Sequence, residues 1–139
     1  MSALGGQMVL GLGTDMIEIS RVEASIRQFG QRFLDRVYTP GEIAYCQRKK
    51  KHAAESFAAR FAAKEAGAKA LGTGISRGIS WKELEVRREP SGKPSLHLTG
   101  RARERADDLG ITNLTLSLTH NRDVAFAVVV AEGPDSQKH

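Results

Sequence analysis

The clearest hydrophobic pattern lies in the C-terminal third of the chain. Leu114, Leu116 and Leu118 alternate with hydroxyl side chains up to His120, and after a turn at 121–123 the segment 124–131 is apolar throughout. Alternation is typical of a strand with one buried face, and an uninterrupted apolar run of this length is typical of a strand covered on both faces. We therefore predict two strands here, with 124–131 at the centre of the sheet.

Three further extended segments are predicted elsewhere. Residues 8–13 have the pattern of a short buried strand, with Asp15 just past its end. Residues 81–88, with alternating apolar and polar positions, and residues 95–99 flank a turn rich in Pro and Gly. This arrangement predicts a β-hairpin.

Apolar residues at helical spacing predict helices between these strands. Ser20 and Glu23 form a capping-box pattern that would start the first helix near Ser20, and Thr39 with Pro40 would start a second. The apolar positions of the first helix are Ile19, Val22, Ile26, Phe29 and Phe33. A long helix is expected from about Ala53 to Leu71, and a short, highly charged surface helix over 100–109, ended by Gly110.

The long helix carries an unusual pair of charges. Glu65 and Lys69 lie one turn apart on a flank whose other members are Ala58 and Ala62, beside an apolar stripe made of Phe57, Phe61, Ala68 and Leu71. Small side chains around a carboxylate let a neighbouring backbone or a ligand come close. The helix is therefore interpreted as one that presents Glu65 and Lys69.

The composition is that of an ordinary globular protein. The 139 residues fit a single domain, with 1–7 as a leader and 133–139 as a tail outside its core, and 40% of them are hydrophobic. The longest apolar run has eight residues, too short to cross a membrane, and no export signal is recognisable. The single Cys46 cannot form an internal disulfide. These features predict a cytoplasmic protein with no membrane association.

The formal charge of +5 indicates an acidic partner, which could be nucleic acid, a phosphorylated small molecule or an acidic protein. The densest basic run, 48–52, contains no aromatic residue that could stack on bases, so a solvated helix end or loop is its simpler interpretation.

Asp15 and Glu65 are the candidate carboxylates of a Mg²⁺ site. A protein usually binds this ion through about two carboxylates, and water molecules supply the other ligands. Asp15 could equally serve as a helix cap. Lys69 could be only an i,i+4 partner of Glu65, worth about 0.3 kcal/mol. Beside a metal it would bind phosphate.

Three other polar residues have both a structural and a functional interpretation. Lys64 falls inside the apolar stripe of the long helix, where snorkelling is its default role. Arg60, at the edge of that stripe, could bind a phosphate or form a surface ion pair. His120 could be a structural histidine at a strand end or part of a ligand pocket. The chain has no Walker loop, dinucleotide-binding glycine motif, zinc-spaced Cys/His cluster or nucleophile elbow.

These segments together resemble the holo-acyl carrier protein synthases, the small 4′-phosphopantetheinyl transferases of bacterial fatty-acid synthesis. The resemblance covers about residues 9–132. It rests on Gly11-Leu12-Gly13-Thr14-Asp15 with Glu18 and Arg21, Arg60-Phe61-Ala62-Ala63-Lys64-Glu65-Ala66, Lys69-Ala70-Leu71-Gly72-Thr73-Gly74-Ile75, Gly92-Lys93-Pro94 and Leu116-Ser117-Leu118-Thr119-His120.

The resemblance implies an α+β fold, a small antiparallel-rich sheet packed against one long helix and shorter helices. It implies Mg²⁺-dependent transfer of the phosphopantetheine arm of coenzyme A to a serine of apo-acyl carrier protein. Asp15, Glu65 and Lys69 would then be catalytic, with Asp15 and Glu65 as metal ligands. Residues implied to bind coenzyme A are Arg60, Lys64, Gly72, Thr73, Gly74, Lys93, Pro94 and His120.

The resemblance also implies a homotrimer with active sites between subunits, so that His120 and the two carboxylates could come from different chains. Arg21, Gln28 and Arg32 would dock the acidic carrier protein. Two alternatives stay open: a basic nucleic-acid-binding module, and a trimer that binds coenzyme A without turning it over.

Overall fold

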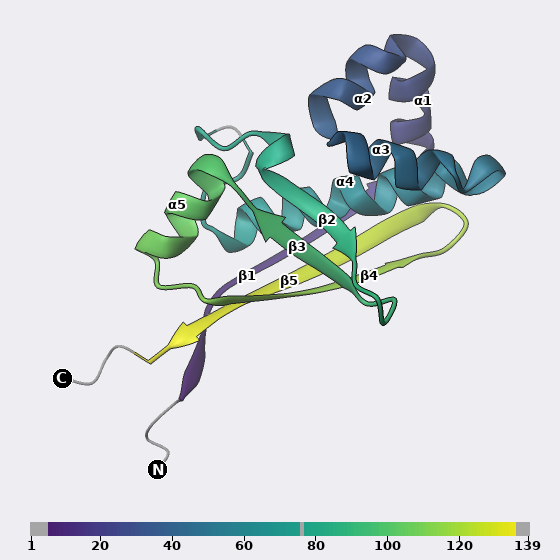
Figure 1. Ribbon diagram of the computed structural model, residues 1–139. Helices are drawn as coiled ribbons and strands as arrows, with labels where there is room; N and C mark the ends of the chain where they lie inside the picture. Colours follow the sequence, from purple (N-terminus) through teal and green to yellow (C-terminus); the bar gives the residue numbers. More distant parts are fainter. Residues whose placement is uncertain (1–5, 76, 136–139) are drawn as a thin grey trace.

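The computed structural model describes residues 6–75 and 77–135, and its main sheet has three antiparallel strands (Figure 1). The strands are β1 (Gln7–Glu18), β4 (Asn113–His120) and β5 (Val124–Pro134), in the order β1-β5-β4. The predicted central position of the apolar C-terminal strand is therefore confirmed. The strands also reach into segments that the sequence assigned to the leader and the tail, because Gln7 pairs with Pro134.

Strand β1 is longer and more exposed than the sequence indicated. It continues for 12 residues, pairing with β5 as far as Glu18, and its side chains alternate between a covered and an open face. Leu12 and Met16 point to the open face and are 60% and 64% exposed. The prediction of a short buried strand that ends before Asp15 was wrong, because backbone pairing with β5 extends the strand through Asp15.

The first predicted helix is divided in two. Helix α1 (Ile19–Phe29) ends at Gly30, whose φ of +58° reverses the chain, and α2 (Gln31–Val37) follows. The predicted capping box is absent, since α1 begins at Ile19, whose backbone N–H donates to the Asp123 carbonyl at 2.9 Å. A contact with the β4–β5 turn thus sets the start of this helix. Phe29, expected in the core, is 47% exposed beside the break.

The remaining helices agree with the sequence. Helix α3 (Pro40–Gln47) has a complete capping box between Thr39 and Glu42, and α5 (Gly100–Asp108) is followed by Gly110 at φ +79°. The basic run lies exposed around a short 3₁₀ helix, η1 (Lys50–His52). The predicted hairpin is present as β2 (Leu84–Arg88) and β3 (Pro94–Leu98), but 81–83 forms a second 3₁₀ helix, η2 (Trp81–Glu83), instead of strand.

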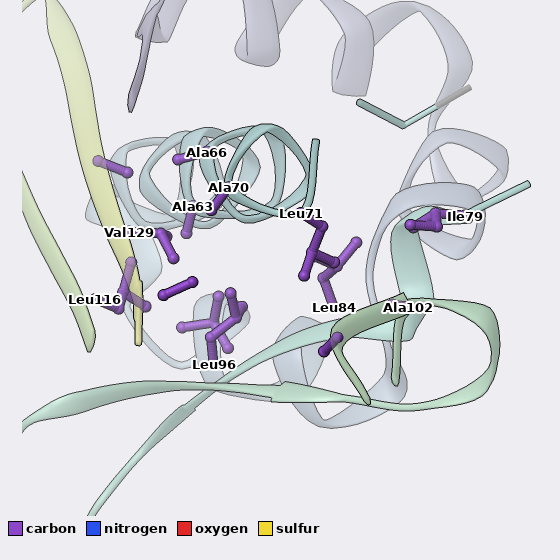
Figure 2. Packing of buried hydrophobic residues seen from close by; sticks show 14 of the residues in the cluster. Ala63, Ala66, Ala70, Leu71, Ile79, Leu84, Leu96, Ala102, Leu116 and Val129 are labelled. Atoms are coloured by element: carbon purple, nitrogen blue, oxygen red, sulfur yellow. The ribbon is translucent and has the colours of Figure 1, made fainter. Parts of the chain in front are cut away.

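Helix α4 (Ala53–Ala70) is the centre of the molecule. It lies along the covered face of the β1-β5-β4 sheet, and Figure 2 shows its alanines packed toward Val129 and Leu116 of that sheet and toward Leu96 of the hairpin. The α+β expectation, an antiparallel sheet packed against one long helix, is confirmed.

Glycines of β1 explain how closely this helix approaches the sheet. A Cβ atom at Gly11 would overlap the Ala70 carbonyl oxygen, and one at Gly13 would overlap the Ala66 carbonyl oxygen. The small residues of α4 and β1 therefore serve a backbone-to-backbone contact. No helix in the described part of the chain is long and apolar enough to cross a membrane.

Candidate functional site

The structure brings Asp15, Glu65 and Lys69 together, although the sequence separates Asp15 from the other two by some fifty residues. Lys69 Nζ lies 3.1 Å from Asp15 Oδ1 and donates to the Thr14 carbonyl at 3.0 Å. Burial raises the pKa of Glu65, the charge of Asp15 raises it further, and Lys69 opposes both effects. Among residues 6–75 and 77–135, Lys69 forms its ion pair with Asp15 and none with Glu65. We call these three residues the acidic cluster.

Strand geometry explains why Asp15 reaches this helix. Side chains alternate across a strand, so Asp15 shares the covered face with Gly11 and Gly13, where α4 packs closely. Glu65 on α4 lies close enough to this strand for the charge of Asp15 to raise its pKa, in addition to the larger effect of burial. The acidic cluster therefore follows from the same close packing that the glycines permit.

The donor set of the acidic cluster fits an incomplete cation site. The described residues contain no group of three or more His, Cys, Asp or Glu side chains arranged to hold a metal ion. Two carboxylates are what Mg²⁺ commonly takes from a protein when water and substrate phosphates supply the other ligands. Burial raises the pKa of Glu65 and repulsion from Asp15 adds to this effect, and a bound cation would relieve that repulsion.

The predicted glycine-containing loop follows the acidic cluster at the end of α4. Gly72 donates its N–H to the Lys69 carbonyl, and Thr73 and Gly74 donate theirs to the Ala68 carbonyl. Gly72 and Gly74 have φ values of +78° and +68°, which glycine adopts without strain. From α5, Arg105 Nε donates to the Leu71 carbonyl at 3.0 Å. These bonds hold the loop one turn beyond Lys69.

A second group of predicted residues lines a cavity of about 380 Å³ on another side of α4. Arg60 and His120 share its wall, together with Tyr45, Lys49, His52, Glu55, Ser56, Ala59, Arg88, Leu118 and Thr119. Arg60 precedes Glu65 by five residues, which corresponds to about 140° around the helix axis. One chain therefore carries the acidic cluster and this basic cavity on different sides of the same helix.

Four cations surround the ring of Tyr45 at this cavity. The Arg60 Cζ atom lies 4.0 Å from the ring centroid, and Lys49 Nζ lies at 4.9 Å. The Cζ atoms of Arg48 and Arg88 both lie at 5.7 Å. Within the described ranges 6–75 and 77–135, none of these four side chains is paired with a carboxylate. We call Tyr45 and its four cations the Tyr45 cluster.

Arg60 has unused hydrogen-bonding capacity. It is only 3% exposed, and its NH1 donates to Ser56 Oγ at 3.2 Å. Its buried Nε has no hydrogen-bond partner in the part of the chain that the structure describes. Burial tends to raise the pKa of Tyr45, but hydrogen bonding to Arg88 and Lys49 and the charges of Arg88 and Arg60 outweigh it and lower the pKa. Uncompensated positive charge and an unpaired buried donor are the features of a site for an anion.

The hairpin turn is connected to the Tyr45 cluster. Arg88 Nε donates to the Tyr45 hydroxyl at 3.0 Å, and Arg88 NH1 donates to the Gly92 carbonyl at 2.6 Å. Lys93 follows, exposed, and Pro94 begins β3 half-buried. The turn whose residues the resemblance implies to bind coenzyme A is thus held beside the basic cavity.

Lys64 has a different environment from the other predicted residues. Its Nζ atom lies 2.7 Å from Glu42 Oε1 with both side chains fully buried, and it donates to the Trp81 and Leu84 carbonyls. The snorkelling interpretation was wrong, because the ammonium group does not reach water. Direct contact between Lys64 and a nucleotide would require this network to open.

The predicted docking residues are exposed on the first two helices. Arg21 and Gln28 lie on α1, whereas Arg32 lies on α2 after the break at Gly30. The three residues therefore do not lie on one helix, although the sequence predicted a single helix through this segment.

Tyr45 and Arg88 were not predicted as site residues. Tyr45 lies on α3, and Arg88 follows it by 43 positions in the sequence, so nothing local connects them. One signal was available: Arg48 and Lys49 follow Tyr45 at i+3 and i+4, which places them beside its ring on a helical turn. The basic run therefore does have an aromatic neighbour.

Comparisons with known proteins identify the family of this chain. Residues 11–129 match the model of the 4′-phosphopantetheinyl transferase superfamily. The chain is 50% identical over 125 residues to holo-[acyl-carrier-protein] synthase from Koribacter versatilis, covering 90% of this chain and 99% of the relative. It is 50% identical over 132 residues to the Maricaulis maris enzyme of the same name, covering 89% and 91%.

Solved structures of such enzymes share the fold. The Helicobacter pylori holo-[acyl-carrier-protein] synthase in complex with coenzyme A is 34% identical, with a TM-score of 0.76 over 86% of this chain and 98% of that one. The Neisseria meningitidis enzyme is 36% identical, with a TM-score of 0.80 over 89% and 98%. The chain described here belongs to the 4′-phosphopantetheinyl transferase superfamily and, within it, to the holo-[acyl-carrier-protein] synthase family.

Proposed function

We propose that this protein transfers the 4′-phosphopantetheine group of coenzyme A to a serine of apo-acyl carrier protein, for fatty-acid biosynthesis. The products are holo-acyl carrier protein and adenosine 3′,5′-bisphosphate. The observation that carries the proposal is the convergence of Asp15, Glu65 and Lys69 in a chain that otherwise matches holo-[acyl-carrier-protein] synthases over nearly its whole length. The Helicobacter pylori relative is described as a complex with coenzyme A, which supports the same donor here.

Asp15 and Glu65 would hold Mg²⁺ at the acidic cluster. When bound, the ion would neutralise charge on the pyrophosphate under attack and on the departing bisphosphate. Lys69 is half-exposed beside Asp15, so its ammonium group can turn to bind a pyrophosphate oxygen. The loop Gly72–Thr73–Gly74, held one turn beyond Lys69, would line the path of the donor.

The basic cavity would hold the nucleotide end of coenzyme A. Arg60 offers its unpaired Nε, and His120 is exposed at the end of β4 in the same wall. Lys93 and Pro94 would close the cavity from the hairpin. We leave Lys64 out of this assignment, because its buried pairing with Glu42 gives it a structural role.

A homotrimer would join the two sides of α4 from different chains. The face of the sheet opposite α4 exposes Leu12, Met16 and Phe126, the last two directly paired between β1 and β5. Open apolar sheet faces of this kind are typical of subunit interfaces. Contact between copies would bury these exposed side chains of β1 and β5.

The acidic carrier protein would dock on the exposed cations of α1 and α2, principally Arg21, with Gln28 and Arg32 beside it. This docking gives the net charge of +5 a partner and explains a cation in the first turn of α1, where the helix dipole disfavours it. A cytoplasmic location is part of this proposal.

The decisive experiment combines the purified protein with apo-acyl carrier protein, coenzyme A and Mg²⁺, and weighs the carrier protein by mass spectrometry. We expect a mass gain of one phosphopantetheine group, dependent on all three additions. Coenzyme A binding without a mass gain would favour the non-catalytic binding alternative. Salt-sensitive binding to DNA or RNA with no coenzyme A binding would favour the nucleic-acid-binding module.

A further inference from the structure

Tyr45 is the uncharged member of the Tyr45 cluster, whose four cations have no carboxylate partner among residues 6–75 and 77–135. We propose that Tyr45 is a positioning residue. It fixes the guanidinium groups of Arg60 and Arg88 in the orientation in which they bind a phosphate monoester on the ribose of the nucleotide substrate. The proposal rests on the proposed function, in that the substrate is coenzyme A and its nucleotide end enters the basic cavity. The consequence is selectivity for coenzyme A over 3′-dephospho-coenzyme A.

The aromatic ring gives Arg60 its place. Arg60 is anchored at one end of its guanidinium by Ser56 Oγ, and the ring lies 4.0 Å from its Cζ atom. A cation over an aromatic face is attracted by the ring quadrupole, more strongly when it is removed from water, as Arg60 is. The contact fixes the guanidinium and leaves its Nε donor free.

The hydroxyl group of Tyr45 gives Arg88 its place. It accepts a hydrogen bond from Arg88 Nε, while Arg88 NH1 is held by the Gly92 carbonyl in the hairpin turn. Two fixed bonds on one guanidinium aim its remaining N–H donors, which lie in the same rigid plane. Tyr45 thereby connects α3, α4 and the hairpin across one cavity.

The number of unpaired charges indicates which phosphate binds here. A ribose phosphate monoester carries nearly two negative charges at neutral pH, and the Tyr45 cluster offers four cations without a carboxylate among the described residues to balance them. In the proposed function, the pyrophosphate of the same molecule binds at the acidic cluster, which includes Lys69. The 3′-phosphate of coenzyme A is the remaining anionic group.

The test compares binding of adenosine 3′,5′-bisphosphate and of 5′-AMP to the full chain by titration calorimetry. Tyr45→Leu should weaken bisphosphate binding about tenfold, since it removes both the ring and the hydroxyl. Binding of 5′-AMP should change less than about twofold in the same variant. Tyr45→Phe keeps the ring and should lose only about threefold toward the bisphosphate. Gln47→Ala, an exposed change on the same helix, is the matched control.

Kinetics with the two donors separate positioning from folding. In Tyr45→Leu the KM for coenzyme A should rise while kcat at saturation is retained, and the KM for 3′-dephospho-coenzyme A should stay near the wild-type value. Equal losses toward both donors or both nucleotides would overturn the proposal. If Tyr45→Leu fails to fold by circular dichroism, an absence of selective loss in Tyr45→Phe would overturn it instead.

The titrations also separate this proposal from the proposed function, because they need neither carrier protein nor turnover. A wild-type protein that prefers the bisphosphate but transfers nothing would overturn only the transferase assignment. A wild-type protein that binds both nucleotides equally would overturn the assignment of Tyr45.

Discussion

Lys69 forms its ion pair with Asp15, at 3.1 Å, and not with Glu65 one turn before it on the same helix. The pair crosses from α4 to β1, so it holds the helix and the strand in the register that brings the two carboxylates together. Glu65 keeps a raised pKa because the remaining positive charge does not offset burial and the charge of Asp15.

Replacing Glu65 should therefore separate function from stability. Glu65→Gln removes a partly buried charge that repels Asp15, so its melting temperature should equal or exceed that of the wild type. Phosphopantetheine transfer should fall about 100-fold or more, because charge stabilisation at the reacting phosphate is lost. Mass spectrometry of the carrier protein and thermal melting measure the two effects. Glu104→Gln on α5 is the control, and wild-type transfer by Glu65→Gln would remove the metal-ligand assignment.

The Glu42–Lys64 pair should prove structural. Glu42→Gln leaves the Lys64 ammonium group buried without a counter-charge, which should reduce the free energy of unfolding by about 3–5 kcal/mol in urea titrations. Gln retains an acceptor for the Val86 N–H, so the double variant Glu42→Gln/Lys64→Met should recover part of the loss. Folded Lys64→Met should keep the wild-type KM for coenzyme A; a selective rise in that KM would restore Lys64 as a substrate contact.

The same lysine predicts a dependence of stability on pH. Burial lowers the pKa of Lys64, and the charge and hydrogen bond of Glu42 oppose this effect without cancelling it. Just below the unfolded-state value of about 10.4, the unfolded chain therefore holds more protons than the folded one, and the free energy of unfolding rises with pH. The wild type should gain stability relative to Lys64→Met as the pH is raised toward that value. A difference that stays constant or shrinks would contradict the lowered pKa.

Gly13 should be intolerant of any side chain. A Cβ atom there would overlap the Ala66 carbonyl oxygen, a backbone atom that cannot turn away, so Gly13→Ala should destabilise the protein by about 3 kcal/mol. The same substitution should shift α4 away from β1. Because Asp15 follows Gly13 by two residues on β1, this shift would separate Asp15 from Glu65 and impair transfer by the molecules that remain folded. Gly6→Ala is the control, because no atom of the other described residues (up to 75 and 77–135) lies within 4 Å of a Cβ at Gly6. Equal melting curves for the two variants would refute the close-packing argument.

Arg21 should affect the binding of the carrier protein and not the binding of coenzyme A. Arg21→Ala is expected to raise the KM for apo-acyl carrier protein about fivefold, more at low than at high salt, and to leave the KM for coenzyme A unchanged. Arg27→Ala removes a cation from the same helix about 120° away and serves as the matched control. An effect of Arg21→Ala confined to coenzyme A would refute the docking role.

The sequence was informative where one segment determines its own structure. The alternating leucines, the apolar strand, the helix start at Thr39 and Pro40 and the glycine at the end of α5 each depend on neighbours within a few residues. Each was present as expected. The start of α1 near Ser20 was also confirmed, but the break at Gly30 was missed and the Ser20–Glu23 capping box is absent. The break depends on the backbone angle of one glycine, and the start depends on a hydrogen bond from the distant β4–β5 turn.

Several residues of the candidate site could be predicted from the sequence, whereas most of their contacts could not. Asp15, Glu65, Lys69 and His120 could be recognised from their own motifs, because a charged or polar residue beside small or apolar neighbours is visible along the chain. Their partners could not be recognised in that way. Tertiary structure alone decided that Lys69 pairs with Asp15, that Lys64 is buried against Glu42, and that Tyr45 gathers Arg60 and Arg88, since each of these contacts joins residues from different elements and is created only by the packing of α4 against the sheet and the hairpin.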